Sequence, residues 1–214
     1  MKGFCLALGL AAAPAAACDT ALLLTIDVSN SIDAAEYALQ TDGMADAVLD
    51  DEVAEALIEG RVALAVMQWS GVDRQALTIP WHKVRTRADV QDFAAQARLM
   101  PRAFVQSDTA PGDAILFALA QFATAPACAR RVIDISGDGT PNAGRDTRAA
   151  ARRAEQSGVT INAIAIESMG LAITTFYRRH VITRDGFVIT ARRHRDYPRA
   201  IREKILREVA RVLG

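Results

Sequence analysis

At 214 residues, the chain is long enough for one α/β domain with a large core and too short for two domains of ordinary size. Its hydrophobic content of 51% and charged content of 23% exclude an extensively disordered or fibrous protein. The 25 basic and 25 acidic residues balance, so the charge does not point to nucleic acid as a partner.

The first 17 residues have the pattern of an export signal. Lys2 supplies the positive end, residues 4–10 an apolar stretch and residues 15–17 a small-residue cleavage site. No other segment approaches the ~20 apolar residues of a membrane-spanning helix. We therefore expect a signal peptide over residues 1–17, a single domain over residues 18–214 and a periplasmic or secreted location.

Two cysteines, Cys18 and Cys128, remain after cleavage at that site. An even pair in an oxidising compartment predicts a disulfide. Cys18 lies nine residues before Asp27, and Cys128 lies ten before Asp138, so neighbouring parallel strands would bring both sulfurs to the same end. A lipid anchor on Cys18 is the alternative, although the preceding residues lack the usual Leu of such a signal.

The first half of the chain predicts a strand, a long helical segment and a hairpin. Residues 21–26 form a continuous apolar run, which is typical of a strand covered on both faces. Helical spacing follows over residues 33–59, with a break at Gly43 or at Asp50-Asp51. Residues 62–69 predict a second strand, and residues 75–79 are expected to pair with it antiparallel.

The second half alternates helices and strands. Thr86 is the predicted N-cap of a helix to Arg98, and Pro111 opens a helix to residue 122. The alternation predicts a doubly wound, mostly parallel α/β sheet with one antiparallel edge strand and helices on both faces. The remaining predicted strands are residues 131–136, 159–166 and 187–190, and the remaining helices are residues 145–156, 171–179 and 197–213.

Oxygen-bearing side chains follow two of these strands. Asp27, Ser29 and Ser31 alternate after the first strand, Asp138 follows the strand at residues 131–136, and Thr109 precedes a helix. Ligands bind such sheets beyond the carboxyl ends of the strands, so neighbouring strands would turn Asp27 and Asp138 into one crevice. Carboxylates and hydroxyls without Cys or His favour a hard divalent cation, most simply Mg2+, with Mn2+ and Ca2+ as alternatives.

Other interpretations of these residues stay open at this point. The Asp-x-Ser-x-Ser pentapeptide alone is also typical of a helix N-cap cluster. Ser107, Asp108 and Asp113 compete with Thr109 for the middle loop, and Asp134 is a rival carboxylate that we place inside its strand.

The combined pattern resembles a known family. The chain is similar to a von Willebrand factor A (VWA) domain, whose metal-ion-dependent adhesion site (MIDAS) has an Asp-x-Ser-x-Ser motif, a Thr on a middle loop and an Asp on a later one. Residues 68–71, 133–139 and 159–166 further resemble a domain-of-unknown-function family of secreted bacterial VWA-like proteins. The resemblance implies direct metal contacts by Ser29, Ser31 and Thr109, with Asp27 and Asp138 often acting through water.

An enzyme is a competing prediction, because a strand-end Asp with a later Gly-Asp-Gly also resembles haloacid-dehalogenase-type phosphatases. The position two after Asp27 is Ser29, however, where that chemistry needs an acid. His82, His180 and His194 have no motif context and are interpreted as surface or loop residues, and the Arg-rich residues 192–195 as a solvated face.

We therefore predict a non-catalytic extracytoplasmic module that binds a partner protein through a divalent cation. The partner would supply an Asp or Glu as the last metal ligand. A Mg-dependent phosphatase-like hydrolase and a metal-free structural scaffold are the alternatives.

Overall fold

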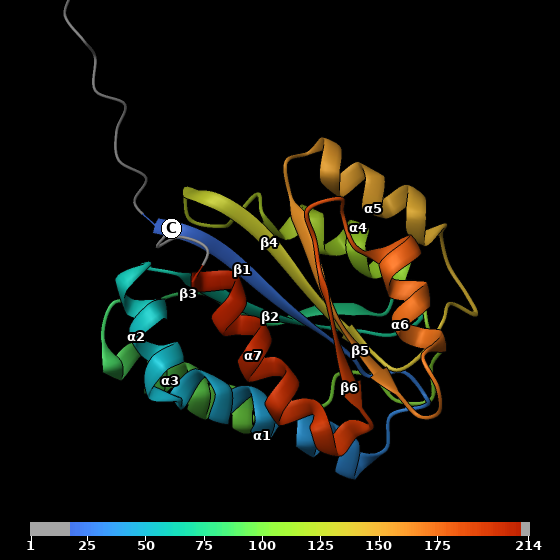
Figure 1. Cartoon of the computed structure of the whole chain (residues 1–214), viewed down its shortest axis with the longest axis horizontal. Helices are drawn as coiled ribbons and strands as arrows, with labels where there is room; N and C mark the ends of the chain where they lie inside the picture. Colours follow the sequence, from blue (N-terminus) through green and yellow to red (C-terminus); the bar gives the residue numbers. More distant parts are fainter. Residues whose placement is uncertain (1–17, 211–214) are drawn as a thin grey trace, which may run out of the picture.

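The computed structural model describes residues 18–210, in which helices cover both faces of one six-stranded sheet (Figure 1). The strand order is β3-β2-β1-β4-β5-β6, and only the β2–β3 pair is antiparallel. The predicted doubly wound sheet with an antiparallel edge strand is thus confirmed. The strands are β1 (Cys18–Asp27), β2 (Ala63–Trp69), β3 (Gln75–Lys83), β4 (Cys128–Gly137), β5 (Thr160–Glu167) and β6 (Val188–Arg192).

The helices divide between the two faces of the sheet (Figure 1). One face carries α1 (Ala34–Leu49), α2 (Asp51–Glu59), α3 (Arg87–Arg98) and α7 (Tyr197–Ala210). The other carries α4 (Pro111–Gln121), α5 (Thr147–Gln156) and α6 (Ala172–Phe176), which continues as a π-helical turn (Tyr177–Val181). Among the helices of residues 18–210, none combines the length and apolar character needed to cross a membrane.

The central strands are apolar throughout because both of their faces are covered. In β1, Leu22 and Leu24 pack into the core under α1 and α7, whereas Leu23 packs into the core under α4 and α5. All three side chains are buried. A continuous apolar run is therefore what this position in the sheet requires.

Local signals set most of the helix boundaries. Thr86 caps α3 through a reciprocal pair of hydrogen bonds with Asp89, as its sequence position predicted. The predicted break in the first helical segment falls at Asp50, which ends α1 and caps α2 by accepting from the Val53 N–H. Gly43 instead allows α1 and α7 to pack closely, because a Cβ at this position would lie 3.1 Å from Pro198 at the start of α7.

Some elements differ in length from the predictions. β3 continues to Lys83 rather than stopping at residue 79, so it pairs with β2 along the full length of that strand. α5 begins at Thr147 rather than at residue 145, because the Asp146 side chain caps it through the Ala149 N–H. The predicted signal peptide, residues 1–17, and the end of the predicted last helix lie outside the described residues.

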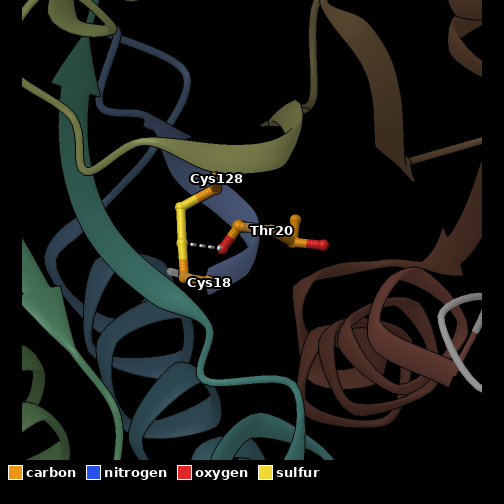
Figure 2. Close-up of a disulfide and its surroundings, with 3 residues drawn as sticks. All are labelled: Cys18, Thr20 and Cys128. Carbon is orange, nitrogen blue, oxygen red and sulfur yellow. Dashed lines mark hydrogen bonds between the residues drawn. A yellow bond between two sulfur atoms is a disulfide. The ribbon is translucent and has the colours of Figure 1, made fainter. Parts of the chain in front are cut away.

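Cys18 and Cys128 form a disulfide (Figure 2), which confirms the predicted pair. The two residues are direct register partners at the first positions of β1 and β4, with their Cα atoms 4.6 Å apart. The bond joins positions 110 residues apart and lies at the end of the strands opposite to Asp27. Disulfides are typical of oxidising compartments, and a sulfur in this bond is not free to carry a lipid.

Candidate metal centre at the carboxyl edge of the sheet

The carboxyl ends of β1 and β4 lie side by side at the centre of the sheet. Asp27 is the last residue of β1, and Asp138 directly follows β4. The register pairs Ile26 with Ser136, so both aspartates leave the sheet at the same level. The structure thus brings the two predicted carboxylates to one edge, as parallel neighbouring strands require.

The Asp27 carboxylate is fully buried and only half satisfied. Its Oδ1 accepts from the Ser29 N–H at 2.8 Å, whereas its Oδ2 has no hydrogen-bond partner among the described residues. Burial raises the pKa of Asp27 to about 7, and the nearby Asp138 charge adds to this, although the hydrogen bonds from Ser29 oppose it. A positive charge beside Oδ2 would favour the ionised form.

The two serine hydroxyls connect the interior to Asp138. Ser29 is buried, and its Oγ lies 3.3 Å from the Oγ of Ser31. Ser31 Oγ in turn donates to Asp138 Oδ1 at 2.6 Å. Four of the five predicted ligands therefore form one connected group of hard oxygen atoms.

The loop that carries the serines is held by the segment between α3 and α4. Arg102 donates to the carbonyl oxygens of Val28 and Ser29 at 2.9 and 3.0 Å, and the Asn30 N–H donates to the Ser107 carbonyl at 2.9 Å. These backbone contacts fix the direction of the alternating side chains. The sequence offered no signal for Arg102 in this role.

Thr109 reaches the same edge from the loop before α4. Its N–H donates to Asn142 Oδ1 at 2.8 Å, and its carbonyl accepts from the Asn142 N–H at 3.1 Å. Its buried side chain lies beside Gly139, where an added Cβ would be 3.5 Å from Thr109 Cγ2. Thr109 and Ser31 line one cavity of ≈ 720 Å³. The structure therefore places all five predicted residues around the same edge.

The residues that competed with Thr109 have other contacts. Asp113 is buried and accepts from the Arg145 N–H at 2.7 Å, so it anchors the loop after β4. Ser107 Oγ accepts from the Gly71 N–H at 3.2 Å. The Asp108 side chain is exposed and lines the cavity.

The rival carboxylate Asp134 lies inside β4, as predicted, and away from this edge. Its Oδ1 is 2.6 Å from Lys204 Nζ, which is also 2.7 Å from Glu208 Oε1. All three side chains are buried, and burial raises the pKa of Asp134. This group joins α7 to the sheet rather than contributing to the edge cluster.

Gly137 and Tyr177 form the floor below Asp27. A Cβ on Gly137 would lie 2.9 Å from Asp27 Oδ2 and 2.5 Å from the Tyr177 hydroxyl, so only glycine leaves room here. The Tyr177 hydroxyl is buried without a hydrogen-bond partner in the described chain. Burial, followed by the charges of Asp27 and Asp138, holds its pKa well above the usual range. Tyr177 begins the π-helical turn, a feature often found at functional sites.

His194 lies on the other side of Asp138. Its Nδ1 is 2.9 Å from Glu36 Oε1, and its Nε2 is 3.9 Å from Asp138 Oδ2. The interpretation of this histidine as a surface residue was wrong, because the turn before α7 folds it into the interior. His82 and His180 are also half-buried, against Phe93 and Phe176.

The donor set fits a hard cation. Within residues 18–210, no three His, Cys, Asp or Glu side chains converge as a metal site, so a cation here would depend on hydroxyl oxygens. Hydroxyls, carboxylates and water are the ligands that Mg2+, Mn2+ and Ca2+ accept. The buried, unpartnered Asp27 Oδ2 is a further acceptor for such a group, directly or through water.

Comparisons with known proteins agree with the fold. A family model described as "Protein of unknown function (DUF1194)" matches residues 17–213. No curated protein matches the chain. Three solved structures illustrate the structural likeness.

Proximal thread matrix protein 1 (PTMP1) from the mussel byssus, solved with a zinc-occupied MIDAS motif, is 21% identical, with a TM-score of 0.65 over 91% of this chain and 48% of that one. The chain thus spans about half the length of that protein. The von Willebrand factor domain of the type V pili tip protein Mfa5 from Porphyromonas gingivalis is 12% identical, with a TM-score of 0.65 over 94% of this chain and 98% of that one. A von Willebrand factor type A protein from Catenulispora acidiphila is 19% identical, with a TM-score of 0.57 over 92% of this chain and 43% of that one. At these identities the likeness establishes the fold.

Proposed function

The chain belongs to the DUF1194 family and has the fold of a VWA domain, and from these premises we propose that it is a non-catalytic module that binds a partner protein through a divalent cation. The observation that carries the proposal is the connected oxygen group at the carboxyl edge of the sheet. In it, the Ser29 and Ser31 hydroxyls link the buried Asp27 region to Asp138.

Five side chains would hold the cation: Asp27, Ser29, Ser31, Thr109 and Asp138. Mg2+ is the first candidate, with Mn2+ and Ca2+ as alternatives, because every donor is a hard oxygen. When bound, the cation supplies a positive charge with an unfilled ligand position. In the arrangement that the VWA resemblance implies, three neutral hydroxyls contact the cation directly and both carboxylates act through water. The ion therefore keeps positive charge at its open position, which suits an acidic side chain of a partner protein.

The burial of Asp27 argues against the phosphatase alternative. A nucleophilic carboxylate must contact the substrate, but the Asp27 side chain is fully buried behind the serine loop. Its raised pKa also reflects a carboxyl group isolated from solvent. These features suit a group that holds the site together from below.

The disulfide supports an extracytoplasmic location. We propose that residues 1–17 are a signal peptide and that residues 18–214 are one exported domain, in the periplasm or outside the cell. Cys18 is engaged with Cys128 rather than available for a lipid anchor, which favours the unanchored form.

Isothermal titration with Mg2+ and Mn2+ tests the proposal. We expect wild-type protein to bind one equivalent, and we expect Ser29→Ala to weaken binding at least about tenfold because a direct donor is lost. Asp92→Asn is the matched control, since it removes a carboxylate from an exposed position of α3 that does not line this cavity. Equal, weak binding in all three proteins would leave the metal-free scaffold as the better description.

Catalysis is tested separately with a generic phosphate ester. The proposal predicts no turnover in the presence of Mg2+ or Mn2+. Turnover by the wild type that disappears in Asp27→Asn would establish a phosphatase and overturn the non-catalytic assignment.

A further inference from the structure

A line of adjacent cavities leads away from the candidate metal centre across the β5–α6 loop. The first cavity, of ≈ 350 Å³, is lined by Ser31 and Asp138 and also by Glu167, Ser168 and Arg193. The last three residues also line a second cavity of ≈ 230 Å³. The two cavities therefore lie next to each other at the end of β5.

The second cavity borders a larger one beside β6, the edge strand of the sheet. Leu171, Thr190 and Arg192 line both of them. The larger cavity, of ≈ 880 Å³, is here called the arginine pocket and is defined by Arg178, Arg192, Arg195 and Arg199. We refer to the three adjacent cavities as the groove.

The arginine pocket has more positive charge than its own carboxylate can offset. Asp196, the acidic residue in its lining, receives two hydrogen bonds of 2.7 Å from Arg199. Arg192 interacts with the same carboxylate through its charge. Arg178 and Arg195 are exposed and form no ion pair with any carboxylate of residues 18–210. Arg192, Arg193 and Arg195 are exposed, as the predicted solvated face requires, and this face is hollowed into a cavity with an excess of positive charge.

Carboxylates elsewhere along the groove are already engaged. Glu167 accepts from the Thr174 N–H at 2.6 Å at the start of α6, and Glu36 contacts His194 at 2.9 Å. These contacts reduce the repulsion that an incoming anion would meet.

Two large apolar side chains stand between the metal centre and the arginine pocket. Met169 and Leu171 have relative exposures of 87% and 61%, and both line the middle cavity. Apolar side chains this exposed next to polar cavities are typical of a surface that a protein partner covers.

We infer that the groove binds an extended acidic segment of the partner protein, with apolar residues on Met169 and Leu171 and carboxylates in the arginine pocket. The inference rests on the proposed function, because the same segment would present its leading carboxylate at the metal centre. The basic charge lies in a concave pocket with an apolar approach, which suits side chains better than a flat anionic membrane.

Fluorescence anisotropy with labelled peptides tests the groove. The probe is a fluorescein-labelled hexaglutamate peptide preceded by two leucines, and the hexaglutamine version of it is the uncharged reference. One protein variant combines Arg178→Gln, Arg192→Gln and Arg195→Gln. Its matched control combines Arg148→Gln, Arg152→Gln and Arg153→Gln, which removes the same charge from exposed positions of α5.

We expect the acidic peptide to bind the arginine-pocket variant about tenfold more weakly than wild type at about 100 mM salt, and the α5 control less than about twofold more weakly. Equal affinity for all three proteins would overturn the inference. Binding to vesicles of equal amounts of phosphatidylcholine and phosphatidylserine is measured with the same proteins. If the arginine-pocket variant binds these vesicles more weakly than its control but binds the peptide equally well, the inference is also overturned, because the pocket would then serve an anionic lipid surface.

Repeating the titration in EDTA and in Mg2+ separates the two proposals. Binding by the arginine pocket persists in EDTA, since guanidinium groups hold those carboxylates. If Mg2+ does not increase the affinity for the acidic peptide and calorimetry finds no metal binding, the metal-centre proposal fails while the proposal for the arginine pocket stands. If Mg2+ binding is intact but the arginine variant binds the peptide like wild type, only the groove fails.

Discussion

Replacing Asp27 with asparagine should stabilise the metal-free protein above neutral pH while removing its metal binding. The wild-type carboxylate is fully buried, and its Oδ2 has no hydrogen-bond partner within residues 18–210. Holding it ionised without a cation therefore costs free energy. Asparagine keeps an oxygen that accepts from the Ser29 N–H but carries no charge.

The size of the effect follows from the pKa of Asp27, which rises from 3.8 to about 7 on folding. At about 1.4 kcal/mol for each pKa unit, the ionised form costs the folded state about 4 kcal/mol. The new amide N–H near Gly137 lacks an assured acceptor, which offsets about 1–3 kcal/mol. We expect a net gain of roughly 1–3 kcal/mol, or a rise in Tm of roughly 2–10 °C for a domain of this length.

The effect has a definite pH dependence. Because the folded-state pKa is raised, the folded protein keeps this proton to higher pH than the unfolded chain does. The wild type therefore loses stability as the pH rises from about 4 to about 7, and the loss is complete above 7. The variant has no such loss, so its advantage is largest at pH 8. Near pH 4 only the cost of the unpaired amide remains, and the variant should be about 1–3 kcal/mol less stable than wild type.

Thermal unfolding in EDTA at both pH values measures this difference. Asp113→Asn is the matched control, since its carboxylate is buried but accepts from the Arg145 N–H, and we expect no gain in stability from it at pH 8. Adding Mg2+ should then raise the Tm of the wild type and leave Asp27→Asn unchanged. A variant that is less stable than wild type at pH 8 in EDTA would show that local structure favours the charged carboxylate, against our reasoning.

Three further perturbations test other parts of the structure. Replacing Cys18 and Cys128 with serine should cost about 3–5 kcal/mol, because their bond closes a long loop, and an unchanged Tm on reduction would contradict this. Gly137→Ala should destabilise the protein by about 1–3 kcal/mol and abolish metal binding. Gly139→Ala, whose added Cβ makes only an ordinary 3.5 Å contact, should leave both the metal binding measured by calorimetry and the Tm nearly unchanged. Lys204→Met should cost about 3–5 kcal/mol in denaturant unfolding by leaving two buried carboxylates unpaired, and a smaller cost would mean that those groups are already protonated.

Much of the fold was predictable because a strand that is buried on both faces has a continuous run of apolar residues in the sequence. Continuous apolar runs located the inner strands, and the Thr86 cap and the proline at the first position of α4, Pro111, set the starts of their helices. The disulfide was predictable because the two cysteines precede matching positions of neighbouring strands. Four of the five predicted ligand residues follow those strand ends, so their convergence required only the correct strand order, whereas Thr109 comes from the loop before α4.

The surroundings of the site depended on contacts that have no local signal. Tyr177 and His194 approach the aspartates from segments far along the chain, and each does so through an irregular turn that periodicity does not predict. The arginine pocket forms only when the π-helical turn, β6 and the start of α7 meet at one edge. The sequence by itself determined the apolar strands of the core and the oxygen-bearing residues predicted as ligands. The packing of distant loops decided what surrounds them, because such contacts are set in space rather than along the chain.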